Sequence, residues 1–228
     1  MAEPIIVIRN LSCTYNSRNF GLFGKKEKKS VIRNMNIDIL AGEIFGISGE
    51  SGCGKTTLAR CILGIVDYEG EISIGGVLQD NRNRKHDHGM AQMVFQDPGT
   101  SLNPVKKIGW LMEEPLIIHR YGTARERSLK VDDMITRVGL DPSCKTRRAS
   151  ELSGGQKQRA CIGRALMLNP KILIADEAIS SLDVSAGAQI LNLFRELRET
   201  ICLTILFISH NKGAVEYLCD RVVDFSRL

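Results

Sequence analysis

The stretch 43–64, EIFGISGESGCGKTTLARCILG, decides the fold, because the spacing of its apolar residues changes partway through. Residues 43–48 form a short apolar run of the kind that makes a buried strand. Farther on, apolar residues recur at helical spacing, at Leu58, Cys61, Ile62 and Ile65. Between the two, GESGCGKT (49–56) matches the pattern G-x-x-x-x-G-K-[ST], which requires a strand before it and a helix after it. The stretch therefore predicts a strand, a phosphate-binding loop and a helix that begins at Lys55.

The loop has the residues needed to bind a nucleoside triphosphate. Its glycines let successive backbone N–H groups point into one cavity, and the helix amino terminus adds about half a positive charge there. Lys55 can reach the β- and γ-phosphates, and the Thr56 hydroxyl can bind Mg²⁺. A glycine-rich turn that merely starts a helix is the alternative. The candidate nucleotide-binding residues are Gly49, Glu50, Ser51, Gly52, Cys53, Gly54, Lys55, Thr56 and Thr57.

Composition indicates a soluble globular protein. The 228 residues, 43% hydrophobic and 25% charged, are enough for one large domain or one domain with a subdomain. The longest apolar stretches, such as 201–208, are shorter than the roughly 20 residues of a membrane-spanning helix. Glu3 and Pro4 interrupt the apolar start, so no leader peptide is expected. We expect a cytosolic protein, unless a partner holds it at a membrane.

Cysteine usage and charge argue against several classes of site. The seven cysteines are widely spaced, with no C-x-x-C pair and no Cys/His cluster, which favours free thiols over zinc or iron–sulfur binding. The net charge of +5 is mild. We expect KKEKK (25–29) to be a solvated loop, with contact to a polyanion or lipid headgroup as the lesser alternative. With one Trp and few other aromatics, the chain offers no platform for stacking bases, and nucleic-acid binding is not expected.

Strand and helix patterns alternate along the chain. Strand patterns occur at 4–8, 31–39, 71–77, 91–95, 171–175 and 203–208. Among the helical patterns, one around Leu111 and Met112 is expected to end before Pro115, and Thr123 with Glu126 has the spacing of a capping box. Strands that alternate with helices predict an α/β fold with a mostly parallel sheet covered on both faces.

Four further motifs accompany the phosphate-binding loop. LSGGQKQR (152–159) precedes an Ala-rich helix, and ILIADE (172–177) follows about a helix length later. FQD (95–97) and FISH (207–210) each close a strand. A GTPase is not favoured, because the guanine site N-K-x-D would need Asp where Ala214 follows Asn211 and Lys212.

This ordered set of motifs resembles the ATP-binding-cassette (ABC) ATPases over essentially the whole chain. The resemblance implies an α/β fold with a P-loop (RecA-like) ABC ATPase core, an N-terminal antiparallel β subdomain and an inserted α-helical subdomain. It further implies one nucleotide-binding domain over residues 1–228, with the helical subdomain at about 98–165. ATP and Mg²⁺ are the implied cofactors.

The resemblance also suggests a role for each candidate site residue. The strand that ends in ILIADE carries Asp176 to the carboxyl edge of the sheet, where α/β proteins bind ligands. There Asp176 would hold Mg²⁺ and Glu177 would polarise the attacking water. Gln96 resembles the glutamine that contacts metal and water, and His210 resembles the switch histidine that contacts the γ-phosphate. Tyr15 resembles the aromatic residue that stacks on adenine, although a half-buried strand tyrosine is the alternative.

LSGGQ (152–156), which resembles the signature motif of the family, implies a dimer. In the family, the amino terminus of the helix that follows this motif closes on ATP held by the opposite subunit. The residues implied in that contact are Leu152, Ser153, Gly154, Gly155 and Gln156. Asp183, in SSLD (180–183), resembles the residue that communicates with the opposite subunit.

Three stretches, 19–29, 49–64 and 94–104, are similar to the second (F- or E-type) ATPase of peptide and nickel importers. This resemblance implies pairing with a different ATPase, with a homodimer as the other option. It also implies two membrane permease subunits, an extracytoplasmic binding protein that acts indirectly, and a peripheral place at the cytoplasmic face of the cell membrane. Residues 100–116 would open the groove for a permease coupling helix, or else form an ordinary surface loop and helix.

Two alternative functions and two differences from the usual sequence of the family remain to be considered. A soluble ABC ATPase of DNA repair or translation is less favoured, because the chain has one phosphate-binding loop and no sustained heptads. A non-hydrolytic regulatory subunit would be expected to lack Glu177 or His210. The usual Pro-Thr after the Asp-Glu pair is replaced by Ala178-Ile179, and Asn211 follows the histidine where an acid is usual. Neither departure removes a catalytic side chain.

Overall fold

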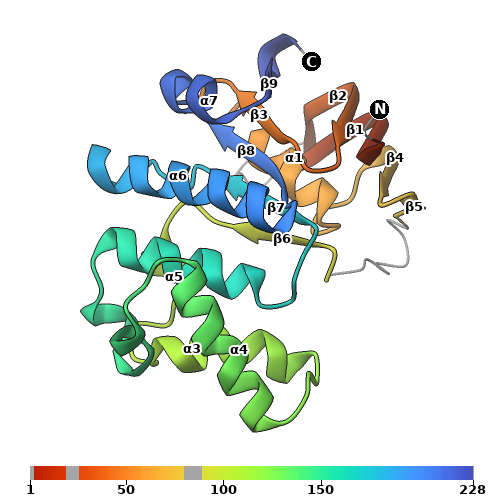
Figure 1. Ribbon diagram of the computed structural model, residues 1–228. Coiled ribbons are helices and arrows are strands. Elements are labelled where there is room, and N and C mark those ends of the chain that lie inside the picture. The colour runs from red at the N-terminus through yellow and green to blue at the C-terminus, as the bar shows by residue number, and fades with distance from the viewer. Residues whose placement is uncertain (1–2, 19–25, 80–88, 228) are drawn as a thin grey trace.

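The computed structural model describes residues 3–18, 26–79 and 89–227 (Figure 1). The described strands form two sheets. The first is antiparallel, with β1 (Pro4–Arg18), β2 (Lys26–Leu40), β4 (Glu69–Ile74) and β5 (Val77–Leu78) in the order β2-β1-β4-β5. The second is parallel, with β3 (Ile44–Ser48), β6 (Ala91–Val94), β7 (Ile172–Asp176), β8 (Thr204–Ser209) and β9 (Arg221–Asp224) in the order β6-β7-β8-β3-β9.

The α-helices fall into two groups. The helices α1 (Lys55–Ile62), α6 (Val184–Ile201) and α7 (Lys212–Leu218) follow strands of the parallel sheet. Four helices lie between β6 and β7: α2 (Pro98–Ser101), α3 (Ile108–Ile118), α4 (Ala124–Arg137) and α5 (Gly154–Leu166). We call residues 98–166 the helical segment, and its helices α3 and α4 project away from both sheets in Figure 1. None of the helices in the described ranges is both long enough and apolar enough to cross a bilayer.

Successive side chains of the parallel strands point to opposite faces of the sheet, so the apolar core has two parts. Leu173 and Ala175 of β7 pack with the helical segment, α6 and α7. Ile172 and Ile174, on the opposite face of the same strand, pack with α1 and the antiparallel sheet. Side chains of a strand point alternately to its two faces, so a strand buried on both faces is apolar throughout. The expected α/β architecture, with an antiparallel sheet beside the parallel one, is confirmed.

The first two strands are longer than the sequence pattern predicts. We expected strands at 4–8 and 31–39 and a solvated loop at 25–29, but β1 reaches Arg18 and β2 begins at Lys26. The loop prediction was therefore wrong for 26–29, while residues 19–25 lie outside the described residues. Backbone hydrogen bonds continue the antiparallel ladder from Thr14 to Arg18, and such bonds require no apolar side-chain pattern.

Helix boundaries agree with the sequence except at Pro115. The helix that begins at Lys55 and the capping box of Thr123 with Glu126 are both confirmed. The prediction that a helix ends before Pro115 was wrong, because α3 continues to Ile118. Proline removes one helical hydrogen bond, but Leu116 is fully buried and packs in the same core as the preceding turn. Tertiary packing therefore overrides the local preference.

Candidate functional site

The carboxyl ends of the central parallel strands and the start of α1 surround a cavity of about 270 Å³. Ten of the predicted site residues line it: Ser51, Gly52, Gly54, Lys55, Thr56, Thr57, Gln96, Asp176, Glu177 and His210. The same edge of an α/β sheet is where ligands generally bind. The structure thus brings together residues that are separated by more than 150 positions in the chain.

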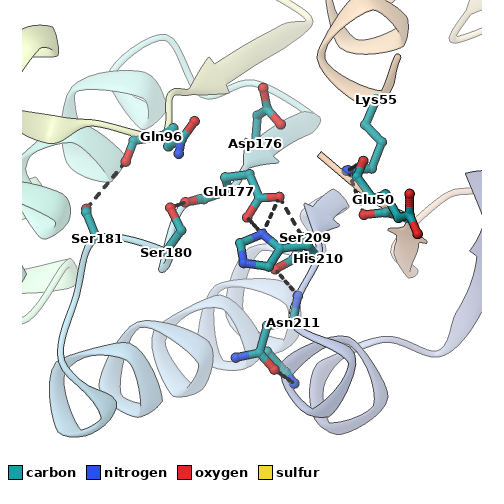
Figure 2. Close-up of polar contacts among 12 residues, drawn as sticks. Glu50, Lys55, Gln96, Asp176, Glu177, Ser180, Ser181, Ser209, His210 and Asn211 are labelled. Atoms are coloured by element: carbon teal, nitrogen blue, oxygen red, sulfur yellow. Dashed lines mark hydrogen bonds and ion pairs between the residues drawn. The ribbon is translucent and has the colours of Figure 1, made fainter. Parts of the chain in front are cut away.

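The loop before α1 is held in a conformation that requires glycine. Gly54 has φ +121°, and a Cβ there would lie 2.7 Å from Cγ1 of Val31, so both the backbone and the space favour glycine. The ammonium group of Lys55 donates to the carbonyls of Gly49 at 2.8 Å and Glu50 at 2.7 Å (Figure 2). Its Nζ also lies 3.8 Å from Sγ of Cys53. The loop therefore wraps around a buried positive charge.

Asp176 is bonded to the first turn of α1. The hydroxyl of Thr56 donates to Oδ2 of Asp176 at 2.7 Å. Asp176 is 5% exposed, and its Oδ1 has no hydrogen-bond partner among the described residues. Burial raises the pKa of this carboxyl above its ordinary value, and the Thr56 hydroxyl partly opposes the effect. Mg²⁺ prefers hard oxygen ligands, so an unpartnered carboxylate oxygen beside a hydroxyl fits this ion.

Glu177 and His210 form a close pair. The ring Nδ1 of His210 lies 2.9 Å from Oε1 and 2.8 Å from Oε2 of Glu177, and the backbone N–H of His210 donates to Oε1 at 3.1 Å (Figure 2). Glu177 is 8% exposed and has φ +52°. Its backbone N–H donates to the carbonyl of Ile208 at 2.9 Å, and its carbonyl accepts from the N–H and hydroxyl of Ser180. These bonds hold a backbone conformation that costs a non-glycine residue about 1–3 kcal/mol.

Two departures from the family pattern leave this geometry intact. Ala178 is 1% exposed in the core, and the turn closes without proline through the bond from the N–H of Ser180 to Glu177. Asn211 caps α7, since its Oδ1 accepts from the N–H of Ala214 at 3.1 Å. Asparagine is as good at this position as an acid.

Gln96 lines the first cavity, whereas Tyr15 lies next to one of its lining residues, Thr57. Gln96 follows β6, and its carbonyl accepts from the Ser181 hydroxyl at 3.5 Å (Figure 2). The Tyr15 hydroxyl accepts from the hydroxyl of Thr57 at 3.5 Å, and Tyr15 is 37% exposed. Tyr15 therefore lies beside α1 without lining the cavity.

The signature residues line a second cavity, of about 460 Å³. Ser153 to Gln156 open α5, where Ser153 accepts from the N–H of Gln156 at 3.3 Å and Gln156 Oε1 accepts from the N–H of Ser153 at 3.1 Å. Asp183 also lines this cavity and caps α6, since it accepts from the N–H of Ala186 at 2.8 Å. The amino termini of α5 and α6 thus both line this cavity. Leu152, by contrast, is buried in the core and does not line it.

Sequence reasoning missed several residues that line these cavities, among them Val31, Ser181 and Arg159. Val31, from β2, lines the first cavity and contacts the phosphate-binding loop. Ser181 bonds Gln96, and Arg159 lines the second cavity, where it donates to the carbonyl of Val138 at 2.7 Å. Arg159 could have been found, because it ends the quoted motif LSGGQKQR. Val31 and Ser181 act across distant parts of the chain and leave no local signal.

Curated proteins similar to this chain are described as transport or import ATP-binding proteins. An oligopeptide transport ATP-binding protein, AppF of Bacillus subtilis (strain 168), is 43% identical over 226 residues, which are 96% of this chain and 68% of that protein. OppF of Streptococcus mutans, with the same description, is 41% identical over 96% of this chain and 71% of its own length. A glutathione import ATP-binding protein, GsiA of Pectobacterium atrosepticum, is 40% identical over 97% of this chain but only 36% of its own length.

Solved structures and a family model agree with these relatives. A dimeric post-hydrolysis ATP-binding cassette, MJ0796 with ADP and phosphate, superposes with a TM-score of 0.81 at 28% identity, covering 96% of this chain and 93% of that one. CbiO1 of Clostridium perfringens, part of an ABC transporter complex, superposes with a TM-score of 0.82 at 25% identity, covering 97% of this chain and 84% of that one. The model for the ABC transporter family matches residues 32–180. The chain therefore belongs to the ABC transporter family, as one of its ATP-binding ATPase chains.

Proposed function

We propose that this chain binds and hydrolyses ATP to power the import of peptides across a membrane. The observation that carries the proposal is the convergence of Lys55, Thr56, Asp176, Glu177 and His210 on one cavity. Peptides are the favoured substrate class, because relatives that match nearly the whole chain are described as oligopeptide transport proteins. None of the relatives described above is a nickel transporter, so the expectation of nickel import has no support from them.

The site residues divide the chemistry between them. Phosphoryl transfer depends on positioning and charge stabilisation more than on covalent chemistry. Lys55 exchanges the loop carbonyls for phosphate oxygens, and the loop amides bind the same phosphates. Mg²⁺, held by Thr56, Asp176 and Gln96, supplies positive charge at the phosphates when it is bound.

Glu177 acts on the attacking water as general base. His210 orients the carboxylate through its ring and backbone N–H, and its half-exposed ring can reach the γ-phosphate. Tyr15, beside Thr57, stacks on the adenine. The positions of Glu177 and His210 in the lining of the first cavity, and of Tyr15 beside Thr57, support these assignments.

Each complete ATP site is formed by two subunits. The first and second cavities lie apart on one chain and share no lining residue, so a second ATPase must supply the signature residues that close on ATP. Asp183, which borders the second cavity, lies where the two subunits communicate. A different ATPase is the preferred partner, and a second copy of this chain is the other option.

The helical segment receives the permeases. Residues 98–165 form an inserted helical subdomain within a single nucleotide-binding domain, 1–228. A cavity of about 540 Å³ between β6 and this segment, lined in part by Phe95 and Pro115, supports a docking place for a permease coupling helix. The subunit is then peripheral at the cytoplasmic face of the membrane, with two permeases and, indirectly, an extracytoplasmic binding protein.

Glu177→Gln tests the assignment directly. Loss of a general base should lower the rate of ATP hydrolysis in the assembled complex by on the order of 10²–10⁴-fold, while ATP binding persists. The matched control is Glu43→Gln, because Glu43 is also buried, at 7% exposure, but bonds Arg221 away from the cavity. An unchanged rate in Glu177→Gln would contradict the proposal, and so would an equal loss in both variants.

A further inference from the structure

Arg164 joins three helices that come from different parts of the chain. It lies near the carboxyl end of α5, whose amino end carries the signature residues. One guanidinium nitrogen donates to the carbonyl of Ser101 at 3.1 Å, and another donates to Oε2 of Glu114 at 2.6 Å. Ser101 ends α2, and Glu114 lies in the middle of α3. A single side chain thus ties α2 and α3 to the signature helix.

The bond to Ser101 anchors the short turn that directly follows Gln96. The turn that ends at Ser101 is closely hydrogen-bonded: Oδ1 of Asp97 accepts from the N–H of Gly99 at 2.7 Å, and the carbonyl of Asp97 accepts from the Ser101 hydroxyl at 2.8 Å. Gln96 directly precedes this turn and lines the first cavity. Because the turn is a compact unit, a change at Ser101 is carried to Gln96.

The bond to Glu114 lies at the weakest turn of α3. Pro115 has no N–H, so the carbonyl of Leu111 lacks the donor that a regular helix would supply at that position. Pro115 and Arg164 line the same cavity of about 540 Å³ between β6 and the helical segment. A permease segment that docks in this cavity would therefore contact Arg164 beside the turn of α3 that lacks one hydrogen bond. We call the contacts of Arg164 with Ser101 and Glu114 the bridge.

We propose that Arg164 is a positioning residue for ATP hydrolysis, which holds Gln96 in place relative to the signature helix and passes displacements of α3 to it. This inference rests on the proposed function, because the position of Gln96 matters only if the first cavity hydrolyses ATP. The bridge needs arginine, because a planar fork bonds two acceptors in fixed directions and a lysine ammonium does not. The two side chains are 35% and 28% exposed, and pairs exposed to this degree contribute little to folding stability.

Arg164→Lys and Glu114→Gln test the inference in the complex purified with the full-length chain. The expected result is a fall in kcat of about tenfold or more, because misplacing a group by about 1 Å can cost on the order of 10²-fold. The KM for ATP should stay within about twofold, since the phosphate-binding loop is untouched. The double variant should be no slower than the slower single variant, because both changes act on the same Arg164–Glu114 contact. Rates are expressed per ATP-binding site, so that unfolded chains do not count.

Arg198 provides a matched control. It also bonds a backbone carbonyl, that of Gly42 at 3.0 Å, and a carboxylate, that of Asp220 at 3.3 Å. Its exposure is similar, at 37%, but its partners lie at the far end of α6 from the first cavity. Arg198→Lys and Asp220→Asn should leave kcat per site unchanged.

The outcomes separate this inference from the proposed function. If the wild-type complex hydrolyses ATP and both bridge variants keep its kcat per site, the inference is overturned while the function stands. Equal losses in the bridge and control variants, a rise in KM without a fall in kcat, or additive losses in the double variant overturn it as well. A wild-type complex without ATP hydrolysis overturns the proposed function, and this inference with it.

Discussion

Asp176 and Glu177 are adjacent in the sequence but have different surroundings. Asp176 ends a strand whose residues are all buried, and it is bonded to Thr56. Glu177 takes a left-handed backbone conformation and instead faces His210. The positive φ at Glu177 turns the chain, so that two neighbouring carboxylates can act on different parts of one ligand. Sequence order alone gives no such distinction.

Thr56→Val should weaken the binding of ATP in the presence of Mg²⁺ and leave binding without Mg²⁺ nearly unchanged. Valine has nearly the same shape as threonine but cannot donate to Asp176 or bind the ion. Loss of a group that supports a metal ligand typically lowers metal affinity by about 10–100-fold. The measurement is ATP affinity with Mg²⁺ and with a chelator, compared as a ratio.

Thr57→Val is the control for this experiment. The Thr57 hydroxyl lies 3.5 Å from the Tyr15 hydroxyl and bonds no carboxylate among the described residues. Its removal should therefore leave the ratio of the two affinities near that of the wild-type protein. If the ratio is also unchanged in Thr56→Val, Thr56 does not hold the ion, and the magnesium site must be formed by other residues.

The ends of helices can be predicted from neighbouring residues more reliably than the ends of strands. Thr123 with Glu126 forms the capping box that the sequence predicts, and Ser153 with Gln156 forms another. Such signals can be read within four residues. The start of β2 and the passage of α3 through Pro115 were mispredicted, because ladder bonds and burial in the shared core decide them.

Thr123→Ala should lower the free energy of unfolding by about 0.5–2 kcal/mol, the range for loss of an N-cap side chain. The loss should also depend on pH. Hydrogen bonds from the backbone N–H and hydroxyl of Thr123 lower the pKa of Glu126 below its ordinary value. A carboxyl with a lowered pKa contributes stability above its unfolded pKa, and that contribution is lost as pH falls through the folded pKa. Denaturant unfolding at neutral and acidic pH gives both quantities.

Glu126→Gln separates the two parts of the capping box. It keeps the Thr123 hydroxyl bond to the N–H of residue 126 but has no charge to titrate. Stability of this variant should therefore depend less on pH between about 5 and 3 than that of the wild-type protein. Equal pH dependence in the two proteins would show that other carboxylates dominate the acid limb.

The molecule as a whole is built from contacts that no local pattern reveals. Ser181 reaches Gln96 across 85 residues, and Arg164 reaches Ser101 across 63. The order of motifs was enough to predict the family, the fold and most of the residues that line the first cavity. It was not enough to predict the bonds between motifs, because these depend on how α2, α5 and the turn after β7 pack together. The bonds of Ser181 with Gln96 and of Arg164 with Ser101 are the kind of contact through which a change at one cavity can affect the other.

Gly155→Asp tests whether phosphate from another subunit enters the second cavity. A Cβ at Gly155 would lie 3.3 Å from Cβ of Ala186, so any side chain causes a similar small shift. Gly155→Asn has the same size as the aspartate variant and no charge, which isolates the electrostatic effect.

If ATP phosphates approach this helix amino terminus, a carboxylate there repels them. We expect hydrolysis in the complex to be at least about tenfold lower for Asp than for Asn, a difference of about 1.4 kcal/mol in the barrier. ATP binding to the first cavity of the same chain should be alike in both variants, because the two cavities have no lining residue in common. Equal rates for the two variants would mean that no phosphate reaches Gly155, and the two-subunit site would have to be abandoned.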